Sequence, residues 1–172
     1  MRCMTIRSLL LVLVLAVGAV GCGKTGRYNI RVTIAPELRD VSEEVHIVGV
    51  NDTDLARWND RSMTQYWLNV GPEQDDVYRM VFGRGFASTN ILSAEDEIWS
   101  RWKSLGARHL FILSLYPMGA KDDTGSADPR RLYLPMEKKR WKISPFKVRD
   151  EIVIEVRPAP EGLKCLTPPN PE

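Results

Sequence analysis

The stretch Tyr28–Ile34 reads YNIRVTI and alternates apolar and polar side chains at every position. Side chains two residues apart point to the same face of a β-strand, so this pattern predicts a strand with one buried face. Glu151–Val156, near the other end of the chain, shows the same alternation. Both patterns are typical of half-buried strands in an antiparallel sheet.

Further apolar runs, separated by turn residues, extend this set of strands. We expect strands at 45–50, 77–82, 108–116, 131–134 and 140–143. Residues 51–67 carry capping residues and aromatic side chains typical of a helical insertion, and Ser93 opens an amphipathic helix that stops at Gly106. The expected fold is mainly β: an antiparallel β-sandwich with a helical insertion and one amphipathic helix.

The residues in front of the first strand, Leu9–Thr25, read LLLVLVLAVGAVGCGKT and admit two interpretations. Gly18–Thr25 fits the P-loop pattern, in which Lys24 and Thr25 would bind a nucleotide phosphate. The same residues also end a segment with a positive start, an apolar centre and small residues, which is the layout of a secretory signal peptide. A P-loop requires a helix after it, whereas Tyr28–Ile34 predicts a strand, so we favour the signal peptide.

The end of this segment, Gly21-Cys22, resembles the processing site of bacterial lipoproteins. The resemblance implies signal-peptide cleavage between Gly21 and Cys22 and acylation of Cys22, the expected lipid-attachment residue. Two or more acyl chains make a stable membrane anchor. Gly23 resembles the signal for transport to the outer membrane, so the expected location is the periplasmic face of that membrane. Ordinary secretion, with cleavage near 18–21, is the alternative.

These features divide the chain into one domain and its flanks. We expect a lipoprotein signal peptide at 1–21, a lipidated tether at 22–27, a single β-sandwich domain at 28–157 and a proline-rich disordered tail at 158–172.

The charge balance argues against a nucleic-acid partner. The chain has 24 basic and 22 acidic residues, and removal of 1–21 takes away Arg2 and Arg7, which leaves the two signs equal. The densest basic run, Lys138–Arg140, is short, and we expect it to be a solvated strand start or turn. No nucleic-acid footprint is therefore predicted.

Few residues suggest catalysis. His46 and His109 lie in apolar strands, where we expect structural hydrogen bonds, and carboxylates gather at turns and helix starts. Cys165 is the one thiol expected in the mature domain once Cys22 is acylated. We expect no catalytic residue, no metal site, no cofactor and no enzymatic activity.

Three stretches of the second half resemble the outer-membrane lipoprotein family of the type VI secretion membrane complex: Ala107–Leu113, Arg140–Lys142 and Ile152–Val156. The resemblance implies a transthyretin-like sandwich that recruits the periplasmic end of a large inner-membrane partner through its loops. The exposed candidates are Pro36–Glu43 and Pro117–Pro129. The function expected is a non-enzymatic adaptor or scaffold facing the periplasm, with a protein partner in the cell envelope.

Two alternatives remain open from the sequence. A ligand- or glycan-binding lipoprotein would use Trp58, Tyr66, Trp67 and the loop at 117–129 as an aromatic rim. A nucleotide-binding protein would use Lys24 and Thr25.

Overall fold

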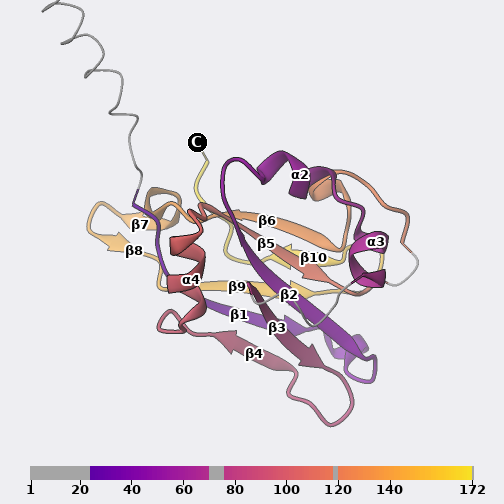
Figure 1. Ribbon diagram of the computed structural model, residues 1–172. Helices are drawn as coiled ribbons and strands as arrows, with labels where there is room; N and C mark the ends of the chain where they lie inside the picture. Colours follow the sequence, from indigo (N-terminus) through magenta and orange to yellow (C-terminus); the bar gives the residue numbers. More distant parts are fainter. Residues whose placement is uncertain (1–23, 70–75, 118–119, 172) are drawn as a thin grey trace, which may run out of the picture.

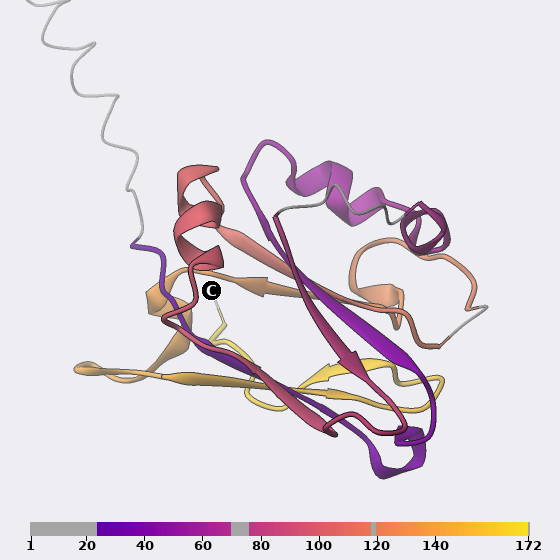
Figure 2. The same ribbon diagram turned by 60° about the horizontal axis from the view of Figure 1, so that its bottom comes forward.

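The computed structural model describes residues 24–69, 76–117 and 120–171. Within these residues, ten strands form two four-stranded sheets and one two-stranded hairpin. The two larger sheets face each other and enclose the main core (Figures 1 and 2).

The first sheet contains the alternating strands predicted from the sequence. Its order is β10-β9-β1-β4, with β1 at Asn29–Ile34, β4 at Thr89–Leu92, β9 at Glu151–Val156 and β10 at Leu163–Cys165. In β1 and β9 half-buried and fully buried residues alternate, because every second side chain points into the core. These two strands run parallel, with Asn29 opposite Glu151, while the other pairs of this sheet are antiparallel.

The second sheet has the order β3-β2-β5-β6. Its strands are β2 at Glu43–Val50, β3 at Val77–Phe82, β5 at His109–Ser114 and β6 at Arg131–Pro135. The interior strands β2 and β5 are buried over most of their length, because helices α2 (Leu55–Asp60) and α3 (Met63–Leu68) cover the face that points away from the core. The ring of Trp58 stacks on Phe111 of β5 at 5.9 Å. This contact confirms that the insertion folds back onto the sheet.

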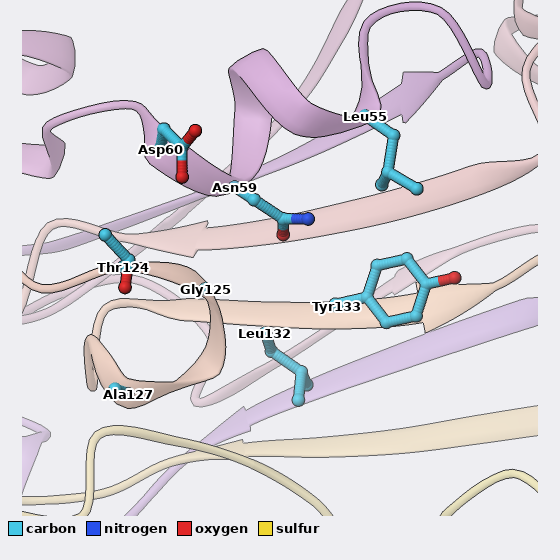
Figure 3. A pocket seen from close by; sticks show the side chains of 8 residues that line it. All are labelled: Leu55, Asn59, Asp60, Thr124, Gly125, Ala127, Leu132 and Tyr133. Atoms are coloured by element: carbon cyan, nitrogen blue, oxygen red, sulfur yellow. The ribbon is translucent and has the colours of Figure 1, made fainter.

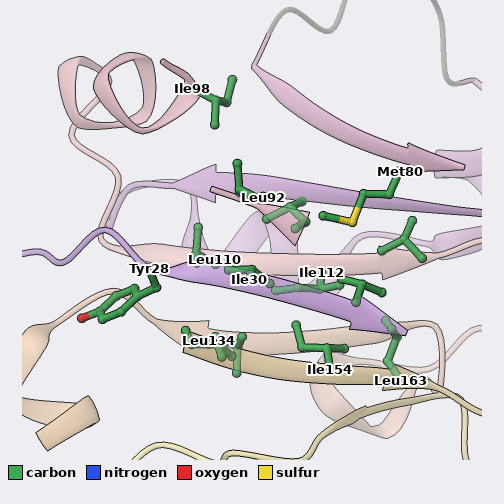
Figure 4. Close-up of a cluster of buried hydrophobic side chains, with 14 of the residues drawn as sticks. Tyr28, Ile30, Met80, Leu92, Ile98, Leu110, Ile112, Leu134, Ile154 and Leu163 are labelled. Atoms are coloured by element: carbon green, nitrogen blue, oxygen red, sulfur yellow. The ribbon is translucent and has the colours of Figure 1, made fainter. Parts of the chain in front are cut away.

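The main core is made of aliphatic side chains from both sheets. In Figure 4, Ile30 and Ile154 of the first sheet lie opposite Leu110 and Ile112 of the second. Helix α4 (Ile98–Ser104) adds Trp99 and Trp102, which are both buried.

Gly49 of β2 makes room for one of these tryptophans. A Cβ at this position would lie 2.4 Å from the Trp102 ring, so the residue must be glycine for the helix to approach the strand this closely.

The predicted fold class is confirmed: the protein is a mainly β sandwich with a helical insertion and one amphipathic helix. Several details differ from the prediction. The β1–β9 pair is parallel, and β4 was not expected. Helix α4 begins at Ile98 and not at Ser93. The Asp96 carboxylate accepts a hydrogen bond from the Ile98 backbone N–H (2.9 Å) at this helix start.

The segment 158–172, which its prolines predict to be disordered, contributes to the sheet. Leu163–Cys165 pairs with β9, and the Leu163 N–H donates to the Pro129 carbonyl (2.8 Å). The proline content of the segment could not predict this pairing, because the partner strand lies elsewhere in the chain.

The segment predicted as a strand at 140–143 is instead a 3-10 turn, η3 (Lys138–Trp141), followed by a hairpin of β7 (Lys142–Ser144) and β8 (Lys147–Val148). Short 3-10 turns also occur at η1 (Pro36–Leu38) and η2 (Gly125–Ala127). Among the described residues, the helices are all too short or too polar to cross a lipid bilayer.

Candidate functional site

Both loops proposed from the sequence as partner contacts lie at one end of the sandwich. We call this the loop end: helix α3, residues 36–43 and the described residues of the loop 117–129 (Figures 1 and 2). Lys24, the first described residue, lies at the opposite end together with the β7–β8 hairpin, and we call this the anchor end.

Glu43 joins the two loops. Its side chain is buried to 1% exposure, and its Oε1 accepts hydrogen bonds from Ser114 Oγ (2.7 Å) and from the Tyr116 N–H (3.3 Å). Burial raises the pKa of this carboxyl group to about 7, against the lowering effect of its hydrogen bonds. The second oxygen, Oε2, is buried with no hydrogen-bond partner. The start of the loop at 117 is therefore fixed to the start of β2 by a buried polar contact.

The glycines and acidic residues of the loop 117–129 are typical of a mobile turn, but its described residues are held by polar contacts to helix α3. Asp122 accepts hydrogen bonds from the Thr64 N–H and Thr64 Oγ1, both at 2.9 Å, and from the Ser62 hydroxyl. Ser62 also caps α3, because its Oγ accepts from the Gln65 N–H (3.0 Å). The loop thus contributes a carboxylate to the N-terminal turn of this helix.

Arg130 completes this network from the start of β6. Its Nη2 lies 2.6 Å from Asp122 Oδ1 and 2.9 Å from Asp128 Oδ2, and Asp128 is fully buried. Burial alone would raise the pKa of both carboxyl groups, but the hydrogen bonds that they accept outweigh it and hold each pKa below its ordinary value. Because Asp128 is buried and ionised, the position of the loop depends on Arg130.

Arg131 attaches the helical insertion to the same strand. Its guanidinium group donates to the backbone carbonyls of Asn59 and Arg61, which lie at and after the end of α2. Two adjacent arginines, Arg130 just before β6 and Arg131 at its first position, therefore hold the loop end together.

An open pocket of about 650 Å³ lies beside this network, between α2, η2 and β6. Figure 3 shows Leu132 and Tyr133 on β6, with Leu55 and Asn59 of α2 on the other side and Thr124 of the loop at one end. The pocket has both polar and apolar walls, so a protein side chain fits its chemistry.

The three aromatic residues proposed as a ligand-binding rim pack against the sheet instead. Tyr66 is buried, Trp67 lies 4.6 Å from the His46 ring, and the Arg61 guanidinium lies 4.8 Å above the Trp58 ring. These rings form a satellite core under α2 and α3, as their helical spacing and apolar faces require. They do not form an open rim, so the structure does not contain the aromatic binding surface that the ligand-binding alternative proposed.

Both histidines make structural hydrogen bonds, as predicted. His46 is buried and bonds the Tyr66 hydroxyl and Glu44 Oε1, both at 2.7 Å, and burial lowers its pKa. His109 bridges Asp52 Oδ1 (2.7 Å) and the Tyr133 hydroxyl (3.0 Å). In the part of the chain that the structure describes, no group of three His, Cys, Asp or Glu side chains could hold a metal ion.

The residues that decide between signal peptide and P-loop lie only partly within the structure. Gly21 and Cys22 are outside the described residues. Thr25 forms a β-bridge with Glu137, and the chain continues extended into β1. A P-loop threonine must start a helix, so this conformation contradicts the nucleotide-binding alternative.

Comparison with known proteins gives likenesses of overall shape only. No protein-family model and no curated protein matches the chain. Among solved structures, the T6SS protein TssM C-terminal domain from EAEC has a TM-score of 0.49 at 13% identity, covering 81% of this chain and 99% of that one. The T6SS lipoprotein TssJ1 from Pseudomonas aeruginosa has a TM-score of 0.46 at 11% identity, covering 86% of this chain and 100% of that one.

Proposed function

We propose that this protein is an envelope lipoprotein, anchored at the periplasmic face of the outer membrane through acyl chains on Cys22, that acts as a non-enzymatic adaptor. In its most specific form, the partner belongs to the type VI secretion membrane complex. The single observation that carries the proposal is the lipoprotein-like processing site at Gly21-Cys22, joined directly to a β-sandwich with a rigid loop end.

Part of the expected tether, 22–27, is already hydrogen-bonded to the domain. The Lys24 carbonyl accepts from the Lys138 N–H (3.1 Å), and the Gly26 N–H donates to the Met136 carbonyl (2.8 Å). The chain therefore joins the domain at Lys24, and two residue steps separate it from Cys22. An extended chain spans at most about 7 Å over that length, so acylation would hold the anchor end against the bilayer.

This arrangement would point the loop end away from the membrane. A partner that approaches from the periplasm would meet the loop 117–129 and the pocket between α2, η2 and β6 first. The Arg130 network keeps this surface ordered before binding, which lowers the entropy cost of association.

Processing of the N-terminus tests the anchor. Intact mass of the native protein should show a mature chain that begins at Cys22 and carries acyl groups. Cys22→Ala should abolish acylation and the membrane association that depends on it, while Cys3→Ala, in the part removed, should change neither. A native product that retains Met1 and sediments with the soluble fraction would refute the proposal.

Recovery of partners tests the adaptor role. The acylated protein should be crosslinked in intact envelopes and its neighbours identified, with the type VI secretion membrane components as the expected hits. A Lys121→Glu/Asp123→Lys variant alters two exposed residues of the loop end and should reduce recovery. Lys103→Glu alters an exposed residue of α4 at the anchor end and should not. Equal recovery with both variants would contradict a partner site at the loop end.

A further inference from the structure

The β7–β8 hairpin is the most exposed apolar element of the described structure. Residues 142–147 are all exposed, and the exposed fractions of the Ile143 and Phe146 side chains are 57% and 100%. Two large apolar side chains this exposed on one short element mark a candidate protein or membrane contact.

The same segment is strongly basic. Residues 138–149 read KKRWKISPFKVR and contain six basic and no acidic residues. The exposed lysines 142 and 147 flank Ile143 and Phe146 on the hairpin itself. An apolar tip flanked by cations is the composition that binds at the interface of an anionic bilayer, because the apolar groups enter the acyl boundary while lysine ammonium groups stay at the headgroups.

The base of the hairpin is rigid. Trp141 is buried, its Nε1 donates to the Pro135 carbonyl (2.7 Å), and its own carbonyl accepts from the Arg149 N–H (2.7 Å). The side chain of Asn170 donates to the Lys142 carbonyl (2.8 Å), so the C-terminal segment holds the first strand of the hairpin in place. The exposed tip is thus presented by the fold and is not a loose loop.

The hairpin also lies where a membrane would be. It projects at the anchor end of the sandwich (Figures 1 and 2), and Lys138, in the turn just before it, donates its backbone N–H to the Lys24 carbonyl (3.1 Å). At about 3.3 Å per residue, the three residues of β7 span about 10 Å, which is more than the reach of about 7 Å from Lys24 to Cys22. A domain tied this closely to its acyl chains brings a hairpin of that length to the bilayer surface.

We propose that the β7–β8 hairpin is a second membrane contact, which places Ile143 and Phe146 in the interface of an anionic phospholipid bilayer and its lysines on the phosphate headgroups. This inference rests on the proposed acylation of Cys22. The hairpin fixes the orientation of the sandwich on the membrane, which a flexible acyl anchor alone does not do.

Trypsin cleavage of the acylated mature protein tests the contact. The protein is reconstituted into vesicles of phosphatidylcholine with and without phosphatidylglycerol, and cleavage after Lys142 and Lys147 is followed by mass spectrometry. In vesicles with phosphatidylglycerol, Ile143→Ser/Phe146→Ser should be cleaved about 30-fold faster than the parent protein, the factor expected when two large apolar side chains are half buried. Each lysine strengthens binding to an anionic surface about fivefold. The parent protein should therefore be cleaved more slowly in vesicles with phosphatidylglycerol than in vesicles without it.

Phe86→Ser is the matched control. Phe86 is 62% exposed and lies on the turn after β3, away from the anchor end, so its loss should leave cleavage at the hairpin unchanged. Both serine variants should retain the parent's urea midpoint, because the residues they replace are exposed.

The outcomes separate this inference from the proposed function. Acylated protein whose hairpin is cleaved equally fast in parent and Ile143→Ser/Phe146→Ser would overturn the membrane contact and leave the anchor intact. A native protein without acyl groups on Cys22 would overturn the proposed function, and with it the contact.

Discussion

Replacement of Glu43 by glutamine should stabilise the protein above neutral pH. The Glu43 carboxyl is buried at the junction of the two loops, and burial raises its pKa from an ordinary 4.5 to about 7. Glutamine has nearly the same shape and retains an oxygen that can accept the hydrogen bonds from Ser114 Oγ and the Tyr116 N–H. It cannot ionise, so the cost of burying a charge disappears.

The size and sign of the effect follow from the two pKa values. The folded-state pKa is higher than the unfolded-state pKa, so the folded protein binds the proton more tightly. The contribution of Glu43 to stability is therefore fully present below pH 4.5 and is lost as the pH rises through about 7. At 1.36 kcal/mol per pKa unit, the loss is about 3 kcal/mol by pH 8. His46 acts in the opposite direction, because its pKa is lowered: its contribution is present above pH 6.5 and is lost as the pH falls from there through the lower folded-state pKa.

The assay must therefore compare the variant with the parent protein at each pH. Urea unfolding, followed by tryptophan fluorescence from pH 4 to 8, gives the free energy of unfolding of both proteins. The difference between them should grow with pH to about 3 kcal/mol in favour of Glu43→Gln. Glu37→Gln, an exposed carboxyl in η1, should show no such growth. A difference that stays constant from pH 4 to 8 would refute the raised pKa of Glu43.

Three further outcomes are expected. Gly49→Ala should lower the free energy of unfolding by about 1 to 3 kcal/mol, measured by urea titration, because the new methyl group meets the Trp102 ring. Arg130→Met should cost about 3 to 5 kcal/mol and expose the loop 117–129 to limited proteolysis, because buried Asp128 loses its cation. Alkylation of Cys165 by iodoacetamide at pH 8 should be slower in the folded protein than in urea, because burial raises the pKa of the thiol; equal rates would contradict this.

The strands that could be predicted are those whose burial pattern is local. Tyr28–Ile34 and Glu151–Val156 alternate because one face of each strand is buried, and 77–82 matches the observed β3 residue for residue. Periodicity does not report which strands are neighbours. The parallel pairing of β1 with β9 joins residues more than a hundred positions apart, so no local pattern contains it.

The loop 117–129 shows the same limit for the candidate site. Its glycines and acidic residues predict a mobile turn, but Asp122 and Asp128 are the acceptors of an arginine network that closes only in the folded protein. The hairpin at 142–148 gave a signal that could have been used. Lys142 and Lys147 enclose Ile143 and Phe146, and the prediction of a solvated turn from Lys138–Arg140 covered only the first three positions of a longer basic segment.

The positions of the two ends constrain how an adaptor of this shape can work. If acylated Cys22 and the β7–β8 hairpin both hold the anchor end, the sandwich cannot rotate freely about its tether. The six residues of β1 span about 20 Å at 3.3 Å per residue, so the loop end stands at least that far from the bilayer surface when the strands point away from it. A partner would then dock on a platform of defined height and direction, and loss of the hairpin tip would weaken recruitment without touching the partner site. Recovery of partners should therefore fall for Ile143→Ser/Phe146→Ser in intact envelopes but not in detergent, where no bilayer orients the protein.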